Sequence, residues 1–173
     1  CSVVVADASQ FRPSLMEKQR HPGDIITPMV SRIAAKSLAS GSEVVLLCRR
    51  NSLPWFVNFG DQGKGDSKGL TGYIELMRSL FPKGVGDYIT ISTAHRYKGL
   101  EKPTVIVMDA VARSYPLIHP DWVFSRVLGD SPEKITSEER RLLYVAMTRA
   151  AEKLVIITDE QSRSPFLDDL QKV

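Results

Sequence analysis

Cysteine and long hydrophobic runs are scarce in this sequence, and each scarcity excludes a class of protein. Cys1 and Cys48 are the only cysteines among 173 residues, which is too few for a disulfide framework and gives no metal-ligand spacing. We interpret Cys48, at the end of an apolar run, as a reduced thiol in the core. The longest apolar runs are far shorter than the about 20 residues of a membrane-spanning helix, and no signal peptide is visible. We therefore expect a cytoplasmic protein without a membrane partner or a metal site.

The motifs that define common small-molecule enzymes are also missing. We find no catalytic triad and no dinucleotide-binding fingerprint. The glycine-rich stretch around Lys64 does not fit the phosphate-binding pattern G-x-x-x-x-G-K-[ST], because Gly65 follows the lysine and the glycine spacing differs. We interpret residues 52–69 as a flexible, solvated loop.

The composition is that of an ordinary globular domain. Hydrophobic residues make up 43% and charged residues 25% of the sequence, both typical values. The length is sufficient for one domain with a core of its own. The net charge of +3 is compatible with contacts to phosphate groups but does not establish nucleic-acid binding. Because the sequence starts at Cys1 and enters an apolar run at once, we expect it to be a piece of a longer chain.

Apolar, β-branched segments alternate with amphipathic ones along the chain. The predicted strands are residues 2–8, 43–48, 88–92, 104–109 and 153–158. The predicted helices run from residue 24 to about 41, from 74 to 81 and from 137 to 150, with a short last one at 165–170. Residues 9–23 look irregular, and the long connection 110–136 includes one candidate helical turn at 122–128. Strands that alternate with helices indicate an α/β architecture with a mainly parallel sheet.

The stretch 137–150 is the most informative of the predicted helices. Ser137 is its expected N-cap residue, and the two glutamates that follow suit the positive end of the helix dipole. Apolar residues recur at the spacing of a buried face, namely Leu142, Val145 and Ala146. Arg149 then lies at the far end of a packed helix, where its guanidinium can neutralise charge that develops in phosphoryl transfer. Taken alone, the pattern also fits a surface helix with a cationic last turn.

Residues 93–101 connect the third and fourth predicted strands and carry a second set of informative residues. Ligands of open α/β sheets collect beyond the carboxyl ends of strands, and this segment leaves such an end. Thr93 and His95 are suited to contacts with a phosphodiester backbone. Gly99 allows close approach of the main chain to a ligand, and Glu101 can accept a hydrogen bond from a sugar hydroxyl. The alternative is that His95 is a structural histidine and Gly99 a helix C-cap.

Together and in this order, these stretches resemble the UvrD/Rep-type superfamily 1 DNA helicases. Residues 93–101 (TAHRYKGLE) resemble motif V of that family, and residues 138–150 (EERRLLYVAMTRA) resemble motif VI. Residues 44–51, a strand followed by Arg49-x-Asn51, look like the weaker motif IV. The resemblance is dense from about residue 43 to residue 170 and weak before it.

The resemblance implies that residues 1–173 form a single RecA-like domain, the second of a two-domain motor. Such a domain is a three-layer α/β structure with a mainly parallel sheet flanked by helices. In that family, ATP lies in the cleft between two such domains, and single-stranded or partly duplex DNA runs across both. The implied cofactors are ATP and Mg²⁺, with Mg²⁺ held by the first domain, which is the other implied partner.

The resemblance also assigns roles to individual residues. Arg149 would be the arginine finger on the γ-phosphate, Glu101 would bind the ribose, and Gly99 would lie close to the nucleotide. Arg49 is a further member of the implied ATP site. Thr93 and His95 would contact the DNA strand, whereas Arg141 is expected to form ion pairs within the domain.

Several family features have no counterpart in this sequence. There is no Walker A lysine loop and no acidic Walker B pair, so the first RecA-like domain is absent and we expect the chain alone to be inactive. The alternative function is that of a non-catalytic nucleic-acid-binding or scaffold domain of a helicase–nuclease complex. Degenerate copies lose motif residues first, and the intact Glu101 and Arg149 favour the motor.

Overall fold

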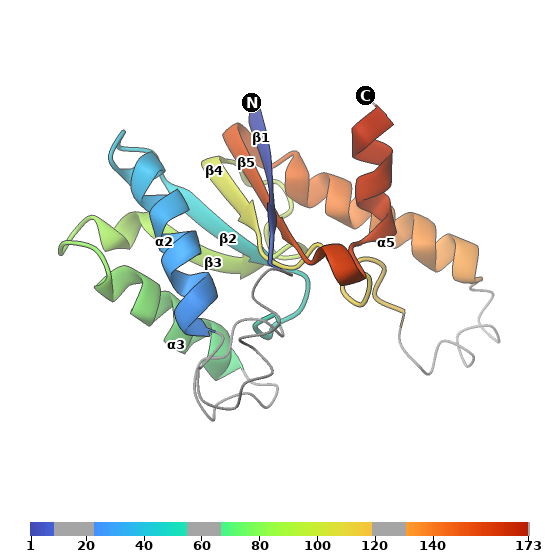
Figure 1. Ribbon diagram of the computed structural model, residues 1–173, viewed down its shortest axis with the longest axis horizontal. Coiled ribbons are helices and arrows are strands. Elements are labelled where there is room, and N and C mark those ends of the chain that lie inside the picture. Colours follow the sequence, from blue (N-terminus) through green and yellow to red (C-terminus); the bar gives the residue numbers. More distant parts are fainter. Residues whose placement is uncertain (9–22, 55–66, 119–130, 173) are drawn as a thin grey trace.

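A five-stranded, fully parallel sheet with helices on both faces forms the centre of the molecule (Figure 1). The computed structural model describes residues 1–8, 23–54, 67–118 and 131–172. The strands are β1 (Ser2–Asp7), β2 (Val44–Cys48), β3 (Ile89–Thr93), β4 (Lys102–Val107) and β5 (Ala150–Thr158), in the order β1-β5-β4-β2-β3. The predicted fold class, a RecA-like α/β domain with three layers, is confirmed.

Two layers of helices cover the sheet because alternate residues of each strand point to opposite faces. In β2, the side chains of Val44, Leu46 and Cys48 join one core cluster with α2 (Gly23–Leu38) and α3 (Ser67–Ser79). The side chains of Val45 and Leu47 join a second cluster with α5 (Pro132–Met147). All five β2 residues are fully buried, as expected for a central strand covered on both faces. Cys48 is the predicted core thiol.

All five predicted strands are present, with ends that differ from the prediction by up to three residues. β5 begins at Ala150 rather than at residue 153, because Ala150 pairs with Lys102 at the start of β4. Three short 3-10 helices complete the described structure: η3 (Gly86–Tyr88), η5 (Glu160–Ser162) and η6 (Pro165–Lys172). The last of them replaces the short helix predicted at residues 165–170.

Two predicted helix starts are wrong, and α5 ends at Met147 rather than at residue 150. α3 begins at Ser67, within the stretch interpreted as a loop, and it packs through the buried Leu70 and Tyr73. α5 begins at Pro132, five residues before Ser137, and its N-cap is Ser131, whose hydroxyl accepts a hydrogen bond from the Lys134 amide at 3.2 Å. The interpretations of residues 9–22, of the loop at 55–66 and of the turn at 122–128 lie outside the described residues.

The connection from β3 to β4 positions the motif residues. β3 and β4 are parallel and separated by β2, so the chain must return across one face of the sheet. It does so in a series of turns over residues 94–99, with Tyr97 buried in the same cluster as α5. Thr93 therefore lies at the carboxyl edge of the sheet and Glu101 at the amino edge.

α5 runs antiparallel to the strands on that same face. It starts near the carboxyl edge and passes into β5 at the amino edge (Figure 1). Within the described ranges, no helix has the length and apolarity needed to span a membrane.

Candidate functional site

Arg149 lies at the junction between α5 and β5, at the amino edge of the sheet. Its backbone is fixed on both sides: its amide donates to the Ala146 carbonyl at 3.3 Å, and its carbonyl accepts from the Lys102 amide at 3.0 Å. The preceding Thr148 is the C-cap of α5, and its hydroxyl donates to the Val145 carbonyl at 3.0 Å. The position of Arg149 is thus set by the junction that directly follows a packed helix, and not by a helix that continues to residue 150 as predicted.

The half-buried guanidinium of Arg149 joins the two motif stretches. One terminal nitrogen donates to the carbonyl oxygen of Leu100 at 3.4 Å, across 49 positions of sequence. The other terminal nitrogen donates to the Thr148 hydroxyl at 3.2 Å, and Nε donates to the Val145 carbonyl at 3.1 Å. Because a guanidinium carries five N–H donors, these contacts hold the group in place without using its full donor capacity.

Gly99, Leu100 and Glu101 form the turn that faces this guanidinium. Gly99 has a φ of +85°, a left-handed conformation that glycine adopts without the penalty of a side chain. The turn closes with the Leu100 amide donating to the Tyr97 carbonyl at 3.2 Å. Glu101 is exposed and follows directly on the residue whose carbonyl contacts Arg149. Gly99, Glu101 and Arg149 are therefore neighbours at one edge.

Thr93 and His95 lie at the opposite, carboxyl edge. Thr93 ends β3 with 8% of its surface exposed, and its hydroxyl accepts a hydrogen bond from the Arg96 amide at 3.4 Å. It thus stabilises the first turn of the crossover. His95 is exposed. Of the two residues predicted to contact DNA, His95 is the one whose side chain is accessible to a DNA strand.

Arg49 is not brought together with Arg149. It follows β2 at the carboxyl edge, where its guanidinium binds Glu139 of α5 through two hydrogen bonds of 2.6 and 2.9 Å. Since α5 rises about 1.5 Å per residue, Glu139 and Arg149 are separated by about 15 Å along the helix. Arg141, predicted to form ion pairs, is exposed and forms none within the described ranges.

A buried polar cluster surrounds this ion pair, and no sequence motif predicted it. Both carboxylate oxygens of Asp109 accept hydrogen bonds from the Arg49 amide, at 3.0 and 3.1 Å. Burial raises the pKa of Asp109 to about 6, against the opposing effect of that amide and of Ser114. Tyr115 is fully buried beside them; burial raises the pKa of its hydroxyl, which has no hydrogen-bond partner among the described residues. The signal available in the sequence is an aspartate at the end of the apolar run 104–109.

Burial lowers the pKa of Arg49, but the hydrogen bonds and negative charge of Glu139 outweigh it. The pKa of Arg49 consequently lies above its usual value. The neighbouring Arg50 has different surroundings from Arg49. Its side chain is exposed and donates a hydrogen bond to the Arg113 carbonyl at 3.1 Å. Arg49 is thus an internal ion-pair partner in this structure, and its assignment to the ATP site stays a prediction.

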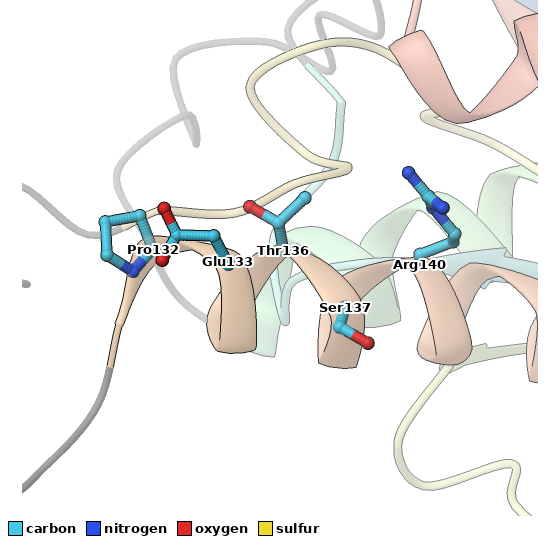
Figure 2. Close-up of a pocket in the computed structure, with 5 residues that line it drawn as sticks. All are labelled: Pro132, Glu133, Thr136, Ser137 and Arg140. Carbon is cyan, nitrogen blue, oxygen red and sulfur yellow. The ribbon is translucent and has the colours of Figure 1, made fainter.

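A shallow depression of about 360 Å³ lies at the other end of α5. Figure 2 shows the side chains that line it along the first turns of the helix: Pro132, Glu133, Thr136, Ser137 and Arg140. None of them belongs to the predicted site. We therefore place the candidate site at the amino edge, around Arg149, and not in this depression.

The fold and this edge define a class, that of parallel three-layer α/β domains of the RecA-like type. A sequence model of the UvrD-like helicase C-terminal domain matches residues 75–161, about half of the chain. The chain belongs to this family.

Two curated relatives illustrate the similarity. The ATP-dependent DNA helicase PcrA of Staphylococcus epidermidis is 37% identical over 78 residues, covering 45% of this chain and 10% of that protein. An ATP-dependent helicase/nuclease protein of Lactobacillus acidophilus is 28% identical over 127 residues, covering 60% of this chain and 10% of that protein. The chain spans about a tenth of the length of these relatives.

Among solved structures, the C-terminal domain of a possible DNA helicase from Lactobacillus plantarum aligns with a TM-score of 0.48 at 16% identity. The alignment covers 96% of this chain and 77% of that one. A likeness at this level does not bear on function.

Proposed function

We propose that this chain is the second motor domain of an ATP-dependent DNA helicase or translocase, with Arg149 as its arginine finger. The observation that carries the proposal is the contact between the Arg149 guanidinium and the carbonyl oxygen of Leu100, the residue that precedes the exposed Glu101. A cation and a sugar-binding carboxylate at one edge suit the γ-phosphate and the ribose of one nucleotide. Membership in the helicase C-terminal family supports this assignment.

In the proposed reaction, ATP is bound in a cleft between this domain and a first RecA-like domain. The Arg149 guanidinium neutralises the charge that grows on the γ-phosphoryl oxygens as the bond to the leaving diphosphate breaks. Its N–H groups are preorganised by the last turn of α5, so little rearrangement is needed during the reaction. Glu101 accepts a hydrogen bond from the ribose, and Gly99 lets the main chain approach the nucleotide.

Mg²⁺ is assigned to the first domain. Within the described residues, no group of three or more His, Cys, Asp or Glu side chains is placed to hold a metal ion. The part of the chain that the structure describes therefore offers no magnesium site, and we derive no step from one.

DNA is proposed to bind at the carboxyl edge, near His95 and the turn that Thr93 stabilises. The nucleotide edge and the DNA edge are joined by the crossover 94–99 and by α5, which pack on one face of one sheet. Closure of the cleft on ATP would then shift the DNA-contacting residues together with Arg149. Reopening of the cleft after hydrolysis would move the domain one step along the DNA strand. Without the first domain, the chain should neither hydrolyse ATP nor unwind DNA.

The proposal is tested by the DNA-stimulated ATPase of the protein with both motor domains present. Arg149→Ala should lower kcat about 10³-fold, because an arginine finger contributes at least that much, while ATP binding stays nearly intact. Arg141→Ala is the matched control, since Arg141 is an exposed arginine on the same helix and should leave turnover unchanged. Unchanged turnover in Arg149→Ala would exclude the finger. A wild-type protein that binds DNA but does not hydrolyse ATP would favour the scaffold function.

A further inference from the structure

Among the buried residues of α5 that the structure describes, Glu139 is the one that makes directional contacts with the rest of the domain. The buried residues of α5 are Glu139, Leu143 and Ala146, spaced along one face of the helix. Leu143 and Ala146 make apolar contacts, which are non-directional and leave the helix free to slide or turn by small amounts. Glu139 is different, because a bidentate arginine–carboxylate pair fixes both distance and orientation.

The pair formed by Glu139 is buried and supported by further groups. Its two side chains are each 11% exposed, and the closest nitrogen–oxygen distance is 2.6 Å. Glu139 also accepts a hydrogen bond from the Leu117 amide at 3.2 Å. On the other side, the Arg49 amide donates to both carboxylate oxygens of Asp109. The end of β2 and the segment after β4 are thus bound to one point of α5.

The other end of α5 carries Arg149, whose guanidinium follows the helix. Two of its three hydrogen bonds are to the last turn of α5, at the Val145 carbonyl and the Thr148 hydroxyl. The backbone of Arg149 is already joined to β5 and to the Lys102 amide. These contacts leave the orientation of α5 about that junction open, and the Arg49–Glu139 pair is a directional contact that can set it.

We propose that Arg49 and Glu139 are positioning residues, which orient α5 so that Arg149 points into the nucleotide cleft. This inference rests on the proposed function of Arg149. Arg49 then contributes to hydrolysis through Glu139 and α5, without touching ATP. A displacement of about 1 Å at a reacting group can cost about 100-fold in rate, so a loosened helix end lowers kcat.

A double-mutant cycle in the protein with both motor domains tests this role. Arg49→Met and Glu139→Met should each lower kcat of the DNA-stimulated ATPase about 10-fold, with KM for ATP changed less than about 2-fold. The double variant should regain thermal stability, because an apolar pair often replaces a buried ion pair without loss of stability. Its kcat should stay as low as that of the singles, since the directional contact is gone. Arg49→Lys, which keeps the charge, should recover part of kcat.

How firmly the end of α5 is held is measured by hydrogen–deuterium exchange of the peptide that spans residues 141–150, because exchange reports local opening of the helix. Glu139→Gln should speed exchange there, whereas Glu138→Gln, at an exposed neighbour on the same helix, should not.

Three results would overturn the positioning role. A double variant that regains wild-type kcat would show that the pair only stabilises the fold. Additive losses with a raised KM would show that Arg49 contacts ATP directly. Equal exchange in Glu139→Gln and Glu138→Gln would show that α5 does not depend on the pair. Arg149→Ala in the same preparation separates the two claims: if it lowers kcat while the Arg49 and Glu139 effects add, the positioning role alone fails.

Discussion

Asp109 is a buried carboxylic acid whose pKa lies above its ordinary value. It is 3% exposed at the carboxyl edge of the sheet, and burial raises its pKa to about 6 although the Arg49 amide donates to both of its oxygens. The pKa of an aspartate in an unfolded chain is about 3.9, roughly two units lower. Folding therefore favours the protonated carboxyl, and Asp109 makes the stability of the domain depend on pH.

The sign of this dependence gives a prediction for Asp109→Asn. Because the pKa of the folded state is the higher one, the contribution of Asp109 to stability is present in full below the unfolded pKa and is lost as pH rises through about 6. Between about pH 7.5 and pH 5, the wild type should gain about 1 kcal/mol of unfolding free energy relative to the variant. Urea unfolding of both proteins across this range measures the difference.

Asp87→Asn removes an exposed aspartate and is the matched control. If the unfolding free energies of wild type and Asp109→Asn change in parallel across the same pH range, the buried carboxylate does not titrate as described.

At the scale of elements, α5 determines where the candidate site lies. The helix of 16 residues begins with Ser131 as N-cap and Pro132 in its first turn, a combination that favours helix initiation because proline needs no amide partner there. Its first turns lie beyond the carboxyl edge, and its last turn holds Arg149. A helix that began at Ser137 would start close to Glu139 and would give the Arg49 pair little support.

The N-cap assignment predicts different effects for two serines. Ser131→Ala should lower the unfolding free energy by about 1 kcal/mol, since the Lys134 amide loses its side-chain acceptor. Ser137→Ala should be close to neutral, because Ser137 is exposed within the helix and alanine is a better helix former. Chemical denaturation of both variants measures the difference. A larger loss for Ser137→Ala than for Ser131→Ala would mean that the helix begins later.

The elements show what sequence patterns can predict and what they miss. The five strands were predicted because apolar, β-branched runs such as residues 44–48 are distinctive of buried parallel strands. The start of α5 was missed because Pro132 was interpreted as part of a connection, although serine followed by proline is a helix-start signal. The start of α3 was missed because Gly69 and Gly72 weaken helix propensity, whereas packing of Leu70 and Tyr73 against the sheet stabilises it.

In the whole molecule, the two sets of motif residues lie at opposite edges of the sheet: Thr93 and His95 at the carboxyl edge, and Gly99, Glu101 and Arg149 at the amino edge. The motif resemblance identified Gly99, Glu101 and Arg149 together, and the contact between Arg149 and Leu100 is consistent with that grouping. Motif spacing alone cannot predict at which edge of the sheet Arg49 lies, because that depends on the order and direction of the strands. Parallel pairing puts the end of β2 opposite the end of β4, away from the start of β5, so Arg49 lies far from Arg149 and pairs with Glu139. For Glu139, the sequence pattern predicts only a favourable negative charge near the start of a helix, and not an ion pair with Arg49.

The most direct test of the central claim is how tightly the two-domain protein, with single-stranded DNA, binds ADP with aluminium fluoride, a mimic of the transferring phosphoryl group, compared with ADP alone. An arginine finger binds the transition state more strongly than the ground state. The wild type should prefer the fluoride complex at least about 100-fold, and Arg149→Ala should lose most of that preference with its ADP affinity unchanged. An Arg149→Ala protein that keeps the full preference would contradict the assignment of Arg149 to the nucleotide.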